Sequence, residues 1–283
     1  MTLPDPEGRD GPAELSIVLV STNQRHLLEQ YLPTLLALRG EATFEVGVVD
    51  NACRDGTADW VVRTYPEVRT IRNAVPRSYA ANVNQGIRRL RRGRYVAVMN
   101  PDVKCLPGLL SESVGFLDRH PDVGLVGPQL LEPDGSVQLS CRRFSTPLTL
   151  VLRGLQLDRV VRAASVDRFL MKDVDHGRSL DVDWVFGAMM IARREAVAAV
   201  GGMDERYRVT HWEDEDWCCA MWRGGWRVCY VPAARAVHEH QQAGRRRPFG
   251  RMGRAKAINA VRMLVKFRGR LSRTAAGAGR PAS

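Results

Sequence analysis

The chain alternates between short apolar runs and stretches whose apolar residues recur at helical spacing. Residues 15–21 form an apolar run that ends on polar residues, as expected of a buried strand, and residues 26–38 have helical spacing and stop at Gly40. The order then repeats. It predicts strands at 44–49, 68–71, 95–99 and 123–126, and helices at 59–65, 78–90 and 106–120.

This alternation predicts an α/β fold with a Rossmann-like, mostly parallel sheet and helices on both faces. The polar residues that follow the strands, Ser21, Asp50 and Asp102, would then meet at the carboxyl edge of the sheet, where open α/β sheets bind ligands. The G-x-G-x-x-G turn is absent after the first strand, which argues against a nicotinamide-dependent enzyme, and the sequence contains no P-loop either.

After Gly127 the alternation stops. We expect a strand at 136–141, a charged lobe or loop at 145–181, and an apolar segment at 182–186. Two helices, at 193–200 and 214–223, each stop at a pair of glycines, and a strand follows at 226–231. Residues 255–267 have apolar residues at helical spacing and predict an amphipathic helix.

Charge changes the interpretation of the C-terminal end. Of the 42 Lys and Arg, twelve lie in residues 239–283, together with one of the 31 acids, so residues 1–238 are neutral and the tail carries the net +11. A basic tail favours an anionic partner, such as a membrane surface. Arg245–Arg247 before the amphipathic helix leave membrane docking and a solvated tail equally open, and with no nucleic-acid-binding motif we expect no nucleic-acid partner.

Neither a membrane span nor a secretory signal is predicted, because the apolar runs are short and residues 1–13 have the composition of a disordered leader. The six cysteines have no C-x-x-C spacing, which predicts free thiols in a reducing compartment. We therefore expect a cytoplasmic protein that would meet the inner face of the cell membrane through its tail.

Three separated segments carry candidate chemistry. Asp102 follows an apolar run, acids at 213–216 open a helix, and His238 follows a late strand. A carboxylate and an imidazole suit a divalent cation, and a further carboxylate suits a general base, so together they predict a metal-dependent transfer from a phosphorylated donor. Each also has a simpler explanation: a turn residue, acids that favour a helix start, and an ordinary histidine.

Several segments together resemble family 2 glycosyltransferases of the GT-A fold, in the branch that contains bacterial rhamnosyltransferases. The similar segments, in chain order, are VDNACRDGT at 49–57, with Cys53 where the family has Ser, YAANVNQG at 79–86, NPD at 100–102, VDWVFGA at 182–188, GGMDE at 201–205 and EDED at 213–216. The resemblance runs from about residue 14 to about residue 268.

The resemblance implies roles for individual residues. Asp102 and His238 would bind Mg²⁺ or Mn²⁺, with the uncharged Asn100 in place of the first acid of the family's D-x-D motif, and Asp214 would be the general base. Crowding among the acids at 213–216 would raise some of their pKa values. The implied donor-binding residues are Ser21, Asp50, Asn84 and Asn100, and the acceptor-side residues are Trp184, Gly187, Ala188, Trp212 and Glu213. Trp184 and Trp212 could equally be core aromatics.

The activity implied is inverting transfer of a sugar, first of all rhamnose, from a dTDP- or UDP-sugar to a glycan, lipid-linked or small-molecule hydroxyl. Another hexose, galactofuranose or a secondary-metabolite acceptor are alternatives. A non-catalytic protein that binds anionic surfaces is an alternative of a different class. The expected organisation is a leader at 1–13, a transferase domain at 14–240 with a nucleotide-sugar half (14–127) and an acceptor half (128–240), and a basic extension at 241–283.

Overall fold

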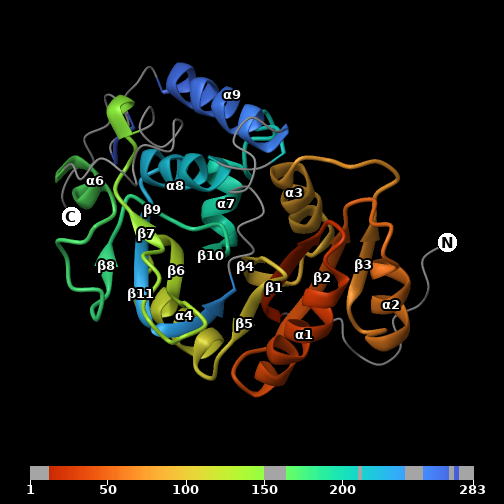
Figure 1. Ribbon diagram of the computed structural model, residues 1–283. Coiled ribbons are helices and arrows are strands. Elements are labelled where there is room, and N and C mark those ends of the chain that lie inside the picture. Colours follow the sequence, from red (N-terminus) through yellow and green to blue (C-terminus); the bar gives the residue numbers. More distant parts are fainter. Residues whose placement is uncertain (1–12, 150–163, 210–211, 240–250, 268–270, 274–283) are drawn as a thin grey trace.

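The computed structural model describes residues 13–149, 164–209, 212–239, 251–267 and 271–273, which form an α/β structure (Figure 1). Its elements, in chain order, are β1 (Ala13–Ser21), α1 (Arg25–Leu36), a 3-10 turn η1 (Ala37–Gly40), β2 (Phe44–Asp50), α2 (Thr57–Thr64), β3 (Arg69–Arg72), α3 (Tyr79–Arg89), β4 (Gly93–Met99), β5 (Val103–Cys105), α4 (Leu109–Arg119), β6 (Val123–Leu131), β7 (Cys141–Arg142), α6 (Ala164–Phe169), β8 (Leu180–Asp181), β9 (Trp184–Val185), β10 (Met189–Arg193), α7 (Arg194–Val200), α8 (Glu213–Arg223), β11 (Arg227–His238) and α9 (Arg251–Lys266).

The central sheet of the described residues has nine strands in two sets. β3, β2, β1 and β4 lie side by side and are parallel, which confirms the parallel sheet predicted for the first half. β10 is antiparallel to its neighbours β4 and β6, while β6 and β11 run parallel to each other. β5 and β8 pair antiparallel with β11. The antiparallel strand β10 therefore joins the two parallel sets.

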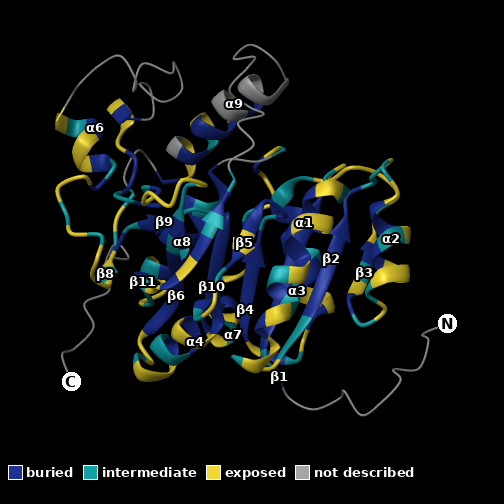
Figure 2. Ribbon diagram, turned by 60° about the horizontal axis from the view of Figure 1, so that its bottom comes forward, coloured by how far each residue is buried: buried dark blue, intermediate teal, exposed yellow. Residues whose placement is uncertain are grey.

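The two faces of the sheet are covered by different helices. Along β1, Leu15, Ile17 and Leu19 belong to the apolar cluster that includes residues of α1 and α4, whereas Val18 belongs to the cluster that includes residues of α3 and α8, because successive strand residues point to opposite faces. The strands that run through the middle of the molecule are correspondingly buried along most of their length (Figure 2). Burial on both faces explains why these strands read as continuous apolar runs.

The second half differs from the sequence prediction at several points. The strand predicted at 136–141 was wrong in its bounds: a single bridge joins Val137 to Leu131, and only β7 is a strand there. The segment at 145–181, predicted to be a loop or lobe, contains α6 and β8, while residues 150–163 lie outside the described part. β5 and β10 were missed. β11 was predicted too short because its second half alternates buried and exposed residues.

The predicted amphipathic helix at 255–267 is confirmed as α9, which lies against α8 (Figure 1). Its inner side is tied to the body by Lys266, whose ammonium contacts Asp216 of α8 at 2.6 Å and Asp204 at 2.8 Å. Met263 and Phe267 are buried in the same apolar cluster as α8. The helix is therefore part of the folded body. The predicted leader at 1–13 lies almost wholly outside the described residues.

Candidate functional site

Asp102 and His238, the predicted metal ligands, meet at one edge of the sheet. Asp102 lies between β4 and β5, and His238 is the last residue of β11, where it pairs with Val103 of β5. His238 Nε2 lies 3.5 Å from Asp102 Oδ1, and both side chains are buried. The backbone N–H of Glu239 donates to the Asp102 carbonyl at 3.0 Å. Strand pairing thus joins two residues that are far apart in the sequence.

Of the two side chains, His238 has a polar partner for its Nδ1, whereas, within the described ranges, Asp102 has a buried oxygen without a hydrogen bond. His238 Nδ1 is 2.8 Å from the amide oxygen of Gln138. Among the residues that the structure describes, no hydrogen bond reaches the buried Asp102 Oδ1. A buried carboxylate oxygen without such a bond costs free energy unless a cation or proton satisfies it.

A chain of hydrogen bonds leads from this edge to the predicted base. The Tyr79 hydroxyl lies 2.9 Å from Asn100 Oδ1 and 3.1 Å from the Gly187 carbonyl oxygen, so its single proton is shared between two acceptors. The Gly187 N–H donates to Asp214 Oδ2 at 3.2 Å. Burial raises the pKa of Tyr79 well above its ordinary value, and Glu213 and Asp214 act in the same direction, so the hydroxyl remains a donor.

The four acids that open α8 have separate surroundings. Asp214 is half-buried, and its Oδ1 accepts from the Glu215 N–H at 2.9 Å. Glu215 is fully buried and accepts from the Ser145 backbone and hydroxyl. Asp216 accepts from the Tyr207 hydroxyl at 2.6 Å, and its pKa is raised mainly by burial, against the effect of Lys266. The pKa of Asp216 is thus raised, as expected for some of these acids, but the cause is burial, and the like charge that adds to it is Asp204 rather than a neighbour in the first turn.

The residues that follow β1 and β2 form a compact loop. The buried Asp50 carboxylate accepts from the Cys53 N–H at 2.7 Å and from the Ala58 N–H at 3.1 Å. The Cys53 thiol donates to the Ser21 carbonyl at 3.3 Å, and burial raises its pKa. Asp50 therefore holds the turn before α2 and lies where a ligand at the carboxyl edge would meet it. Contact with the nucleobase of the sugar donor stays a prediction for Asp50 and Ser21.

Asn84 faces the loop before α8. Its amide nitrogen donates to the Met203 carbonyl at 2.8 Å and to Glu205 at 3.0 Å, and its oxygen accepts from the Met203 N–H at 2.9 Å. A side chain at Gly202 would place Cβ 2.2 Å from the Asn84 oxygen, so this approach requires glycine. Asn84 thus anchors a loop of the second half onto α3, and its predicted contact with the donor stays a prediction.

The predicted acceptor-side residues lie together, but several are buried. Trp184 and Trp212 are 2% and 3% exposed, and the Trp184 Nε1–H donates to the Arg143 carbonyl. This burial favours the core-aromatic alternative for both rings. Gly187 and Ala188 contribute backbone groups, since the Ala188 carbonyl accepts from the Asn100 N–H at 2.8 Å.

Two residues of this site were missed by sequence reasoning. Tyr79 lies within a recognised segment, yet no pattern distinguishes a buried hydroxyl that bridges two loops. Gln138 follows a turn and lies within the segment at 136–141 that was predicted as a strand. Its burial shows only in the structure, where it follows five exposed residues, so no sequence signal singles it out.

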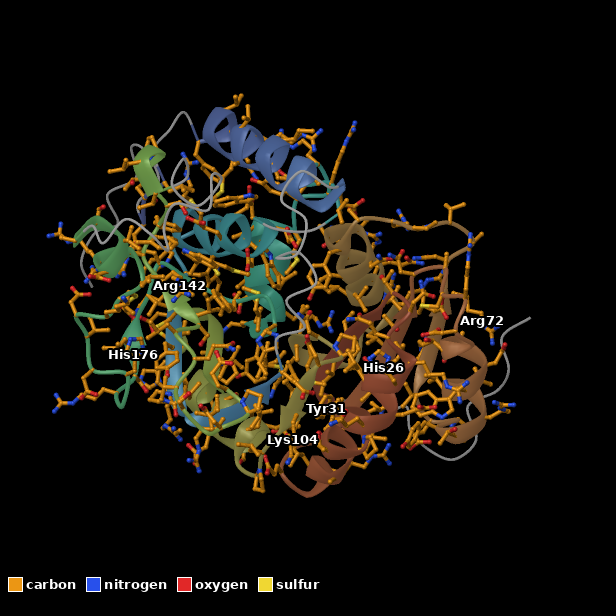
Figure 3. The ribbon with its side chains drawn as sticks, viewed as in Figure 1. His26, Tyr31, Arg72, Lys104, Arg142 and His176 are labelled. Atoms are coloured by element: carbon orange, nitrogen blue, oxygen red, sulfur yellow. The ribbon has the colours of Figure 1, made fainter. Side chains whose placement is uncertain are left out.

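A cavity of about 320 Å³ lies on the α1 side, lined by Tyr31, Lys104, Val237 and Glu239 among others. Figure 3 shows Tyr31 and Lys104 beside each other there. The Tyr31 hydroxyl donates to Glu239, and burial raises the pKa of Tyr31 to about 12. The cavity adjoins the Asp102 edge, because Val237 and Glu239 flank His238 in the chain and the Glu239 N–H donates to the Asp102 carbonyl.

The glycosyl transferase family 2 model matches residues 16–197, so the chain belongs to this family of glycosyltransferases. In sequence, the chain is 29% identical over 244 residues to an N-acetylglucosaminyl-diphospho-decaprenol L-rhamnosyltransferase of Mycobacterium tuberculosis, covering 83% of this chain and 78% of that protein. It is also 26% identical to the O-antigen biosynthesis protein RfbC of Myxococcus xanthus, over 83% of this chain and 18% of that longer protein.

Solved structures show the same GT-A fold. GalNAc-T7, solved with UDP, GalNAc and Mn²⁺, matches with a TM-score of 0.65 at 13% identity, over 90% of this chain and 48% of that one. The mannosyltransferase PcManGT of Pyrobaculum calidifontis, solved with GDP-Man and Mn²⁺, matches with a TM-score of 0.56 at 18% identity, over 98% of this chain and 79% of that one. Both confirm the predicted fold.

The residues at the Asp102 edge fit a divalent cation. An oxygen and an imidazole nitrogen are a suitable donor pair, and their 3.5 Å separation is below twice a metal–ligand distance of about 2.1 Å. The unsatisfied Asp102 oxygen would gain a partner. In the described part of the chain, no group of three or more His, Cys, Asp or Glu side chains surrounds one point, so further ligands would come from elsewhere.

Proposed function

We propose that this chain is an inverting glycosyltransferase that uses a nucleoside diphosphate sugar and a divalent cation. The observation that carries the proposal is the connected set of contacts from His238 and Asp102, through the NPD segment and Tyr79, to Gly187 and Asp214. It supports a catalytic site over a surface-binding protein with a degenerate fold, because such a protein has no need for an aligned carboxylate and ligand pair.

Asp214 is the base in this proposal. Its carboxylate removes the proton of the acceptor hydroxyl while that oxygen bonds to the anomeric carbon, and the bond to the nucleoside diphosphate breaks on the opposite side. The Gly187 N–H, at 3.2 Å, holds one carboxylate oxygen in place. Asp102 and His238 would hold Mg²⁺ or Mn²⁺, which supplies positive charge near the departing diphosphate.

The donor and acceptor follow from the relatives. We propose rhamnose from dTDP-rhamnose as the first candidate and a lipid-linked sugar as acceptor, because the mycobacterial relative is named as a rhamnosyltransferase acting on a diphospho-decaprenol-linked sugar. Bacterial cell-wall or polysaccharide synthesis is the corresponding role. Donors with other sugars or with UDP, and glycan or small-molecule acceptors, remain for the experiment to separate.

A thermal-shift panel of nucleotide sugars, each with and without Mn²⁺, tests the donor. A ligand at 100 times its Kd stabilises the folded state by about 2.7 kcal/mol, which is a measurable rise in Tm. We expect dTDP-rhamnose with Mn²⁺ to give the largest rise. EDTA should stop turnover and Mn²⁺ or Mg²⁺ should restore it. If no donor stabilises the protein, the proposal is refuted. Full turnover after chelation would refute the proposed metal requirement.

We also propose that α9 lies against an anionic membrane surface. The side chains Ile258, Val261 and Val265 are 46%, 59% and 72% exposed and lie along one side of the helix, opposite the packed side. The tail supplies twelve basic residues against one acid. Each basic residue near an anionic leaflet contributes roughly 1 kcal/mol, and exposed apolar side chains add burial at the interface. None of the described helices is long and apolar enough to cross a bilayer.

Vesicle co-sedimentation tests this docking. Because α9 is part of the folded body, the informative variant is the triple substitution Ile258→Ser, Val261→Ser and Val265→Ser. Its matched control replaces the exposed Val62, Val75 and Leu148 by Ser. We expect binding to anionic but not neutral vesicles, weakened by salt and by the α9 variant alone. Equal recovery with both vesicle types would refute docking.

A further inference from the structure

A second set of polar contacts lies on the Nδ1 side of the His238 ring. Gln138 is buried, its amide oxygen lies 2.8 Å from His238 Nδ1, and its amide nitrogen donates to Glu132 Oε1 at 2.9 Å. On its other side, the imidazole turns Nε2 toward Asp102 Oδ1 at 3.5 Å. Four side chains are thus in series, and each contacts the next through a defined atom.

These contacts determine which ring nitrogen carries the proton. A carboxylate accepts only, so Glu132 requires the nitrogen end of the Gln138 amide. The oxygen end therefore faces the ring, and because an amide oxygen also accepts only, His238 Nδ1 must be the donor. In the neutral ring, Nε2 is then the unprotonated nitrogen, and it is the one that faces Asp102.

The backbone makes this arrangement possible. β6 pairs with β11 up to Leu131, and the chain then turns through Gly135, whose φ is +84°. The Glu132 N–H donates to the Ser136 carbonyl at 2.8 Å and the Gln138 N–H to the Leu130 carbonyl at 2.9 Å. The hairpin thereby brings Gln138 back beside the end of β11.

We propose that Gln138 is a positioning residue that holds His238 in the tautomer protonated on Nδ1, so that Nε2 and Asp102 together present a site for a divalent cation. The inference rests on the proposed metal-dependent function and names the residue on which the cation site depends. Glu132 acts one step further out, because it fixes the orientation of the Gln138 amide. Partners of this kind fix the ring orientation of metal-binding histidines in general.

The first test reads the tautomer directly in metal-free protein. Ring ¹⁵N spectra distinguish protonated from unprotonated nitrogens, and His238 is assigned by loss of its signals in His238→Asn. We expect Nδ1–H in the parent protein and a mixture of tautomers in Gln138→Met, which keeps the volume and removes the acceptor. The double variant Glu132→Gln with Gln138→Glu exchanges donor and acceptor and should restore Nδ1–H.

The second test measures binding of Mn²⁺ alone, from the paramagnetic broadening of the same signals. Loss of such a partner typically lowers metal affinity about 10–100-fold, and we expect that loss in Gln138→Met and recovery to within a few fold in the double variant. The control is Gln129→Met, which removes contacts with the Tyr230 hydroxyl and the His176 carbonyl but none with the site.

The outcomes are distinct. A parent protein protonated on Nε2, or equal Mn²⁺ affinity in Gln138→Met and Gln129→Met, would overturn the inference. Should Gln138→Met fail to fold, the double variant and the parent spectrum still decide it, because a neutral ring protonated on Nε2 and not on Nδ1 in either would contradict the arrangement. Failure of the proposed transfer with every donor would leave the ring spectrum and the Mn²⁺ affinity as expected, so the two failures are distinguishable.

Discussion

The loop after β2, in the first half, and the first turn of α8, in the second half, use buried carboxylates differently. In the loop after β2, Asp50 accepts from backbone groups three and eight residues further along the chain. In the first turn of α8, Glu215 accepts hydrogen bonds from Ser145, which is 70 residues away, and Asp216 contacts Lys266, which is 50 residues away. The loop after β2 is thus held by local contacts, whereas the first turn of α8 takes its contacts from distant segments that have folded against it.

Because of this difference, we expect substitutions in the two regions to have different effects on the site. A change in the local loop after β2 should affect the donor while the rest of the site remains in place. A change at α8 should affect the base, the 141–149 segment and α9 together, because the first turn of α8 contains Asp214 and contacts both Ser145 and Lys266.

The largest effect should come from Asp214→Asn. Removal of a general base typically lowers the rate about 10²–10⁴-fold, and we expect transfer to fall by that factor while donor affinity changes by no more than a few fold. Asp59→Asn is the matched control, since Asp59 also lies in the first turn of a helix, α2, in the other half. Single-turnover rates and donor titrations measure both effects. A transfer rate close to the parent would exclude Asp214 as the base.

The same contrast explains what the sequence could predict. The first four parallel strands and their helices were predictable because each is a local apolar pattern ended by Gly, Pro or polar residues. β10 was not, because it passes into α7 at Arg193–Arg194 without a turn. Asp102 and His238 were predicted by family resemblance, but the Gln138 contact depends on the register of a hairpin, which no local pattern specifies.

The next effect concerns stability. Glu215→Ala leaves the buried Ser145 N–H and hydroxyl without their carboxylate, and we expect a loss of about 2–3 kcal/mol in the free energy of unfolding. For a chain of this size, that corresponds to a fall in Tm of roughly 5–10 °C. Asp50→Ala should cost a similar amount. Hydrogen exchange should separate them: faster exchange at residues 141–149 for Glu215→Ala, and at 53–58 for Asp50→Ala. Identical exchange maps would contradict the comparison.

A smaller effect is expected where the halves meet. Tyr79→Phe removes the proton shared by Asn100 and Gly187 and should cost about 1 kcal/mol of stability. Transfer should fall severalfold, because the Gly187 loop that holds Asp214 loses its link to the NPD segment. Tyr95 lies near the start of β4, away from Asn100, which follows the end of that strand. Tyr95→Phe removes a hydroxyl contact with Asp118 and should leave the transfer rate unchanged. Equal rates in the two variants would show that Tyr79 does not couple the halves.

The smallest expected effect is a pH dependence of the stability with which α9 is held to the body. Burial alone would raise the pKa of Asp204, but hydrogen bonds from Arg206 and Lys266 outweigh it and lower that pKa. A lowered carboxyl pKa contributes stability above the unfolded value of about 3.9, and this contribution is lost as pH falls below it. The pKa of Asp216, raised by burial, changes stability in the opposite sense, since its contribution is lost as pH rises. Hydrogen exchange of α9 should therefore accelerate below about pH 4, relative to α2, after correction for intrinsic rates. Asp204→Asn should remove that difference, and an unchanged acid response in this variant would show that the Asp204–Lys266 contact does not hold α9 to the body.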